Sequence, residues 1–138
     1  MSAAAVRVEW QGLDTAQRVL SGLAIAGRNL FPLMDEIGGA LETSTRVRFE
    51  DGDGPDGKRW TPSKRGGQTL VDTGRLLASI TSNASRTSVE VGSNLIYAAT
   101  HQFGRDAIPA RPFLGLSVDD GREIEAIVED YLRGAMSR

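Results

Sequence analysis

The chain has 138 residues, of which 40% are hydrophobic and 25% are charged. This composition is typical of a globular protein and excludes a disordered or fibrous chain. The length suits one domain that buries about two-thirds of its unfolded surface, so we predict a single domain over residues 1–138. The formal net charge of −2 gives no whole-chain argument for nucleic acid or an anionic membrane as a partner.

The sequence also lacks the marks of several kinds of site and location. It contains no cysteine, which excludes disulfides, thiolate metal ligands and thiolate nucleophiles. The first residues, MSAAAVRVEWQG, lack the apolar core of a signal peptide, and no apolar run approaches the roughly 20 residues of a membrane helix. We therefore expect a protein that is made and kept in the cytoplasm, with no membrane partner.

The N-terminal region predicts a strand followed by a helix. Val6, Val8 and Trp10 alternate with charged residues, which is the period of a half-buried strand. Asp14 is suited to cap the helix that follows, and Gly27 is suited to end it.

A second helix is predicted to begin after Asn29, with Pro32 tolerated in its first turn. Gly38 and Gly39 fall in its middle, where they cost about 2 kcal/mol relative to two alanines. They indicate a close helix contact, a kink or simple tolerance of glycine, and the sequence leaves the three open. The apolar side of this helix comprises Leu33, Met34, Ile37, Leu41 and Val47.

Residues 50–69, EDGDGPDGKRWTPSKRGGQT, form a long loop without hydrophobic periodicity. Loops of this length in compact domains are usually functional or disordered. The loop is acidic at its front and basic behind, and this mixture favours docking onto a protein partner through Lys58, Arg59 and Trp60. Nucleic acid is a weaker alternative, because the upstream acids offset the basic residues.

The same loop does not match a metal or phosphate site. Counted from Asp51, three positions that a calcium loop requires are filled by Pro55, Asp56 and Pro62. Its glycines lack the lysine and the strand-to-helix context of a phosphate loop. We expect no cofactor here, and we predict that the loop is mobile in the free subunit and becomes ordered on assembly.

The second half of the chain predicts a short helix over residues 74–80 capped by Thr73, and one or two helical turns over 95–103. Between them a hairpin is predicted over 82–92, with its second strand beginning at Thr87. A capping box then precedes a clearly amphipathic last helix. The box comprises Asp120 and Glu123, and the apolar face comprises Ile124, Ile127, Val128, Tyr131 and Leu132. The predicted fold class is α+β: a small, mainly antiparallel sheet packed against N-terminal helices and a C-terminal amphipathic helix, with a long mobile loop.

The stretch from residue 97 to residue 115, YAATHQFGRDAIPARPFLG, combines large apolar anchors with backbone-fixing residues. Pro109 and Pro112 lock their own φ angles and push the residue before each of them towards extended geometry. Residues 108–113 should therefore form a stiff extended segment, which suits a fixed contact surface better than a hinge.

For two arginines and two phenylalanines in and near this stretch, the sequence predicts a contact or a degree of burial. The guanidinium groups of Arg75 and Arg111 can hold a carboxylate in a planar fork, supplied by Asp72 or by a partner subunit. For Arg111, whose backbone is fixed by the flanking prolines, we favour a defined contact over free solvation. Phe103 and Phe113 are expected to be at least partly buried.

His101 is the only histidine, so one subunit cannot supply a zinc site with two histidines. A lone histidine without an orienting partner is more typical of a partly buried polar residue than of a general base. The alternative hypothesis is a small hydrolase or nuclease in which His101 acts with Asp106 or Asp72.

Four motifs occur in order along the second half: DTGRL at 72–76, YAA at 97–99, HQFG at 101–104 and IPARPFLG at 108–115. Together they resemble the virion morphogenesis or tail completion proteins of Mu-like phages, which are related to wider head–tail joining families. Upstream residues that fit the same pattern are Phe49, Asp56, Gly57 and Trp60. The resemblance runs from about residue 37 to residue 132.

The resemblance implies a structural protein of the phage neck or tail end, located in the virion, with no enzymatic turnover and no cofactor. Such proteins complete or cap the tail and join it to the head as ring-forming adaptors, commonly sixfold. The implied partners are further copies of the chain, the tail-tube protein and head–tail connector proteins, with a passing contact with DNA in the channel as a weaker alternative. The candidate contact residues are Lys58, Arg59, Trp60, Arg75, Tyr97, His101, Gln102, Phe103, Arg111 and Phe113.

Overall fold

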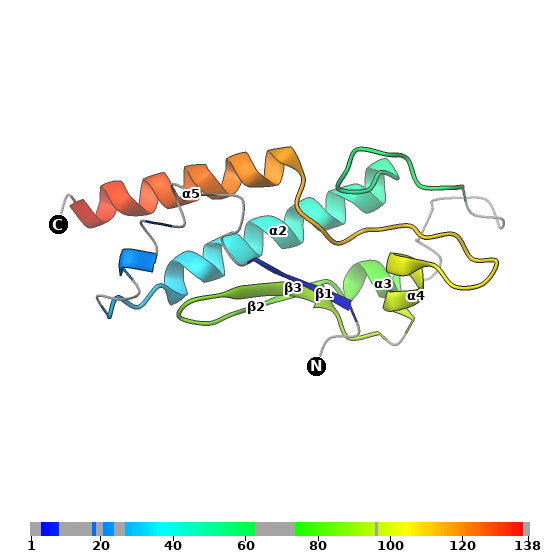
Figure 1. Ribbon diagram of the computed structural model, residues 1–138, viewed down its shortest axis with the longest axis horizontal. Helices are drawn as coiled ribbons and strands as arrows, with labels where there is room; N and C mark the ends of the chain where they lie inside the picture. The colour runs from blue at the N-terminus through cyan, green and yellow to red at the C-terminus, as the bar shows by residue number, and fades with distance from the viewer. Residues whose placement is uncertain are drawn as a thin grey trace.

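The computed structural model describes residues 4–8, 18, 21–23, 27–62, 74–95 and 97–136, and for residues 4–8 and 135–136 it describes the backbone alone. The predicted α+β class is confirmed: helix α2 lies between a small antiparallel sheet on one side and helix α5 on the other (Figure 1). The elements are β1 (Ala4–Val8), α2 (Phe31–Asp51), α3 (Arg75–Ala78), β2 (Thr81–Ala84), β3 (Val89–Ser93), α4 (Ala98–Phe103) and α5 (Val118–Met136). No helix in these residues is both long and apolar enough to cross a membrane.

Helix α2 begins close to its predicted start after Asn29 and ends two residues inside the predicted loop, at Asp51. Pro32 lies in the first turn, and the side chain of Asn29 accepts a hydrogen bond from the backbone N–H of Phe31. The helix ends at Gly52, whose left-handed conformation lets its N–H donate to the carbonyl of Arg48. The predicted apolar side is buried at Leu33, Met34, Ile37 and Leu41.

Val47 is the exception on this helix, because 42% of the residue is exposed. The buried stripe instead continues from Leu41 through Thr45 and Arg48 to Phe49. Thr45 lies four positions after Leu41, and Arg48 and Phe49 lie three and four positions after Thr45, which is the spacing of one helix face. Val47 points to the solvent side of the helix. The prediction for Val47 was therefore wrong, and a buried arginine occupies the stripe in its neighbourhood.

The three strands are arranged in the order β1–β3–β2, with both neighbouring pairs antiparallel. The predicted hairpin is confirmed, with Thr81 opposite Gly92, but its second strand begins two residues later than expected. The delay arises because the turn is closed by the pair Ser85 and Ser88, which are linked through both backbone and side-chain hydrogen bonds.

Parts of the two N-terminal predictions lie outside the described residues. The first strand pairs with β3 over residues 4–8, so its predicted extension to Trp10 lies outside them. Of the helix predicted over residues 14–27, residues 18 and 21–23 are helical and most of the remainder lies outside them as well.

Helix α5 is confirmed as the amphipathic last helix, but its capping box is shifted. The predicted pair was Asp120 with Glu123, whereas the backbone N–H of Asp120 donates to Ser117 Oγ and the Asp120 carboxylate accepts from the N–H of Ser117. Asp120 is therefore the inner partner of the box, and the helix begins at Val118, three residues earlier than a cap at Asp120 predicts.

The two glycines in the middle of α2 differ in their surroundings. A Cβ atom placed on Gly38 would lie 2.8 Å from Ser82 Oγ and 3.0 Å from Val89 Cγ2, whereas one on Gly39 would meet nothing within 4 Å. The close approach at Gly38 is thus made with the sheet, and Gly39 is simply tolerated.

We predict opposite effects for alanine at these two positions. Gly39→Ala should raise the free energy of unfolding by up to about 1 kcal/mol, because alanine favours helix. Gly38→Ala should lower it, because overpacking against Val89 costs about 1–3 kcal/mol. Chemical denaturation of both variants measures the difference, and equal stabilisation by the two would contradict the close packing of α2 on the sheet.

Candidate partner interface

The segment from Pro109 to Gly115, here called the proline segment, is held by side chains from other parts of the chain instead of by strand pairing. Trp60 Nε1 donates to the carbonyl of Pro112 at 2.7 Å. Arg48 donates to the carbonyls of Phe113 at 2.8 Å and Gly115 at 3.2 Å. Buried carbonyls are costly when left unpaired, so these donors fix the path of the segment.

Gln102 on α4 satisfies the remaining groups in the middle of the proline segment. Its Oε1 accepts from the backbone N–H groups of Phe113 and Leu114, each at 3.0 Å, and its Nε2 donates to the Leu114 carbonyl at 3.0 Å. One amide side chain therefore replaces a strand neighbour along two residues. Gln102 therefore has a structural role inside the subunit, whereas the sequence had suggested that it contacts a partner.

Arg111 makes the defined contact that was predicted, but with different partners. Its Nε donates to the carbonyl of Thr61 at 2.7 Å and its NH2 to the carbonyl of Pro62 at 3.1 Å, with only 9% of the residue exposed. A carboxylate partner was expected, and two carbonyls of the preceding loop take that place. The backbone N–H of Arg111 also donates to the carbonyl of His101.

An aromatic cluster lies beneath the proline segment. The ring of Phe49 stands edge-on to Trp60 with centroids 5.6 Å apart, and lies 5.7 Å from the ring of Phe113. Phe113 is fully buried, as predicted, and Trp60 is 6% exposed. Trp60 is therefore a core residue of the subunit, and the expectation that it docks onto a partner is corrected.

The loop predicted over residues 50–69 is partly folded. Residues 50–51 belong to α2, and the backbone N–H of Trp60 donates to the Gly52 carbonyl while that of Gly54 donates to the Lys58 carbonyl. This region is thus a small closed turn and not an extended loop. The prediction of ordering on assembly now concerns residues 63–69, which lie outside the described part of the chain.

A buried ion pair connects α2 to α5. Arg48 NH2 lies 2.5 Å from Asp120 Oδ2, with side-chain exposures of 7% and 5%. Burial lowers the pKa of the Arg48 guanidinium, and the Asp120 carboxylate opposes that shift. The other carboxylate oxygen of Asp120 accepts a hydrogen bond from Ser44. The same carboxylate therefore caps α5, pairs with α2 and leaves none of its oxygens unpartnered.

Half of the predicted contact residues remain available at the surface. Phe103 is 74% exposed and Tyr97 39%, which corrects the expectation that Phe103 would be buried. The exposed cations of the candidate set are Lys58, Arg59 and Arg75. Arg59 approaches Asp53 at 3.9 Å, a solvated pair of little energetic weight.

His101 lies on α4, between Tyr97 and Phe103 in the sequence. Its ring stands edge-on to Tyr97 at 5.7 Å, and its Nδ1 is buried without a hydrogen-bond partner among the residues described. Burial lowers the pKa of His101, and the positive charge of Arg111 lowers it further, so the ring is neutral at pH 7.

Among the described residues, Asp106 is not positioned as the acid–base partner of His101 that the hydrolase alternative requires. The Asp106 carboxylate is 91% exposed and faces Arg105 at 4.0 Å, and Asp72 lies outside the described residues. Within those residues no group of three or more His, Asp or Glu side chains is arranged to hold a metal ion.

Sequence reasoning missed Arg48 and Asp120 as the residues on which this region depends. The available signal was the position of Arg48 on the apolar stripe of α2, about one turn after Thr45 and two turns after Leu41. It also missed Arg105 and Ile108, which are exposed on the turn after α4. The proline pattern pointed to the right region, while the contacts within it depend on distant side chains.

The fold places a segment anchored by distant side chains beside exposed residues on and after α4. The model of the phage virion morphogenesis family matches residues 9–133. The chain belongs to this family, which confirms the resemblance drawn from the motifs.

A curated relative gives the same answer. The chain is 38% identical over 136 residues to the protein named Mu-like prophage FluMu G protein 2 of Haemophilus influenzae, with 93% of this chain and 96% of the relative covered. No solved structure matches. A role in phage virion assembly follows from the family.

Breaking the buried ion pair is expected to destabilise the fold strongly. Arg48→Met leaves the Asp120 carboxylate buried without its charge partner, which costs about 3–5 kcal/mol of unfolding free energy. Urea denaturation measures the loss. Adding Asp120→Asn should recover part of it, because the uncompensated charge is then removed.

The matched control is Arg133→Met, which removes an arginine whose side chain is 72% exposed and contacts Glu129 and Asp130. Its effect should stay within about 0.5 kcal/mol. Comparable losses for Arg48→Met and Arg133→Met would show that burial of the pair has no special weight.

His101 should make stability depend on pH in a defined direction. Because its pKa in the folded chain lies below the ordinary 6.5, the unfolded chain binds more protons as pH falls through that value. The contribution is fully present above pH 6.5 and is lost on acidification towards the folded pKa. The loss of unfolding free energy between pH 7.5 and pH 5 should be smaller for His101→Asn than for the unmodified chain, and equal slopes would contradict this account.

Proposed function

We propose that this protein is a ring-forming adaptor of the phage neck or tail end, which completes the tail and joins it to the head. Its partners in this role are further copies of itself, the tail-tube protein and head–tail connector proteins. It would act through shape and charge complementarity, without turnover or cofactor, and would be built into the virion in the bacterial cytoplasm.

The observation that carries the proposal is the division of the motif residues into two sets. Gln102, Arg111 and Phe113 hold the proline segment inside the subunit, while Tyr97 and Phe103 from the same stretch face solvent. The proline segment is firmly fixed, and the large apolar side chains of Tyr97 and Phe103 are exposed next to it in the chain. This arrangement suits an assembly surface, because a fixed backbone loses little conformational entropy when it binds.

The family and the relative support the general role. The family is defined by virion morphogenesis, and the relative carries the name of a Mu-like prophage protein. Ring formation and the position at the neck go beyond these findings. They rest on the resemblance of the motifs and on the exposed surface described above.

Deleting the gene from the phage or prophage that encodes the chain tests the role. We expect DNA-filled heads and separate tails that fail to join, seen by electron microscopy, with a drop in infectious titre of several orders of magnitude. Supplying the chain from a plasmid should restore joined particles. Normal joined particles without the gene would contradict an adaptor function.

A further inference from the structure

Two surface features remain without a function. The first is formed by Phe103, Arg105 and Ile108, on α4 and the turn behind it, and is here called the knob. Phe103 is 74% exposed, Ile108 is 45% exposed, and the Arg105 side chain is 76% exposed. The knob thus combines two apolar side chains with one cation. The Asp106 carboxylate on the same turn lies 4.0 Å from Arg105, in a solvated pair that offers little resistance to a new partner.

The backbone of the knob is rigid. Arg105 and Ile108 exchange both backbone hydrogen bonds, at 3.0 and 2.8 Å, and so close a tight two-residue turn. Gly104 adopts a φ of +77°, and a Cβ atom there would lie 2.9 Å from the backbone nitrogen of Ala110. Only glycine lets the chain double back so closely, and the turn therefore fixes the backbone positions from which these side chains project.

The second feature is a groove of about 460 Å³ between α2 and the beginning of α5. Its floor is apolar, with Leu41 and Ile124 both buried. Its rim carries the exposed carboxylates of Asp119 and Glu123. Asp119 approaches Arg122 at 3.7 Å, and both side chains are more than three-quarters exposed, so this pair offers little resistance to a new partner.

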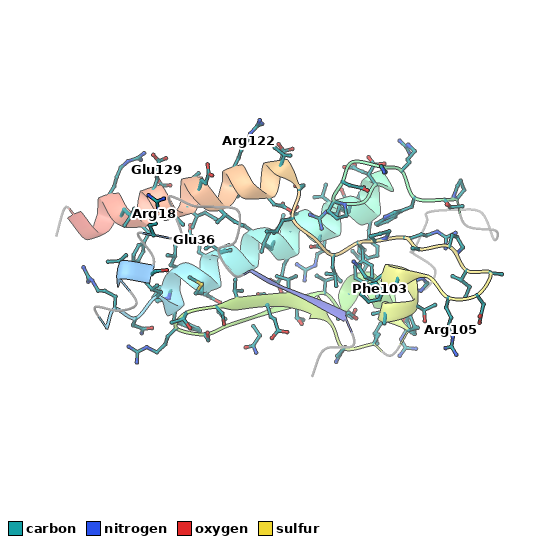
Figure 2. All side chains as sticks on the ribbon, viewed as in Figure 1. Arg18, Glu36, Phe103, Arg105, Arg122 and Glu129 are labelled. Atoms are coloured by element: carbon teal, nitrogen blue, oxygen red, sulfur yellow. The ribbon has the colours of Figure 1, made fainter. Side chains whose placement is uncertain are left out.

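The knob and the groove are complementary in chemistry and separate in space. Apolar side chains beside a cation match an apolar floor beside two carboxylates. Figure 2 shows Phe103 and Arg105 at the α4 end of the molecule, whereas Arg122, next to Glu123, projects from α5 on the other side of α2. The two features of one chain therefore do not meet.

We propose that the knob of one copy docks into the groove of the next copy, with Phe103 on the apolar floor and Arg105 between Asp119 and Glu123. Because two different surfaces are joined, the contact is heterologous and generates a ring when its rotation closes. This inference rests on the proposed adaptor function and specifies the contact that would build the ring.

Charge reversal tests the contact. Arg105→Glu and Glu123→Arg should each weaken self-association roughly tenfold or more, measured by sedimentation over a concentration series. An equimolar mixture of the two variants should associate more tightly than either variant alone, because each then meets an opposite charge. No recovery in the mixture, or unchanged association of both single variants, would overturn the proposal.

The controls reverse charges of similar exposure elsewhere. Glu125→Arg changes an exposed residue of α5 outside the groove, and Arg133→Glu changes an arginine whose side chain is 72% exposed. Both should associate as the unmodified chain does. Weakening by the controls to the same degree would attribute the effect to net charge and would overturn the specific contact.

Cross-linking gives a second readout, because it reports which positions of two copies lie close together. The chain has no cysteine, so Ala107→Cys on the turn of the knob with Thr43→Cys at the groove introduces the only two thiols and keeps the charges of both features. A short bismaleimide should join them between copies into a ladder of covalent oligomers, whereas Ala107→Cys with Glu125→Cys should give much less product. Equal ladders, or a chain that stays monomeric at every concentration, would overturn the docking.

Failure here is distinguishable from failure of the adaptor function. If the gene deletion leaves heads and tails unjoined while the knob variants restore joined particles, the adaptor function stands and the knob-to-groove contact is wrong. If particles form normally without the gene, the adaptor function itself is wrong.

Discussion

The structure depends on the buried guanidinium of Arg48. It pairs with Asp120 at the start of α5 and donates to two carbonyls of the proline segment. Burying an arginine is costly, and an apolar replacement of such a pair is often no less stable. What the guanidinium adds is direction: its planar donors fix where α5 begins and where the proline segment runs relative to α2.

The path of the proline segment likewise depends on side-chain donors, Arg48 among them. Pro109 and Pro112 lack an N–H group, so the segment cannot form a regular strand ladder. Its carbonyls are instead satisfied one by one by Trp60, Arg48 and Gln102, each from a different part of the chain. This arrangement links α2, the turn after it and α4 into one unit, and the residues on and after α4 inherit that rigidity.

The elements could be predicted where local pattern decides them. The α2 stripe, the hairpin and α5 follow from periodicity and turn residues, and these predictions are confirmed except at Val47. The capping box was misplaced because Ser117 and Asp120 form as good a local motif as Asp120 and Glu123. What decides between them is Arg48, which lies 72 residues away and holds Asp120 at the helix start.

The candidate site was harder to predict because exposure depends on what packs against each side chain. Phe103 and Phe113 are the same residue type within one stretch, yet one is 74% exposed and the other fully buried. Phe113 lies over Phe49, while α4 turns Phe103 outward because its neighbour Gln102 must face the proline segment. Sequence analysis located the stretch, and tertiary contacts divided its residues between core and surface.

The outer edge of the sheet gives a further reason why assembly would use side-chain docking. An uncovered edge strand invites pairing with a strand of another chain. Here the backbone N–H of Ser82 on β2 donates to Glu42 Oε1 at 2.8 Å, and Arg46 donates to the carbonyl of Ile80 just before β2. Side chains of α2 thus occupy backbone groups on this edge that strand addition would need. A strand added on this side of the molecule would have to displace these side chains, which favours a contact made through side chains.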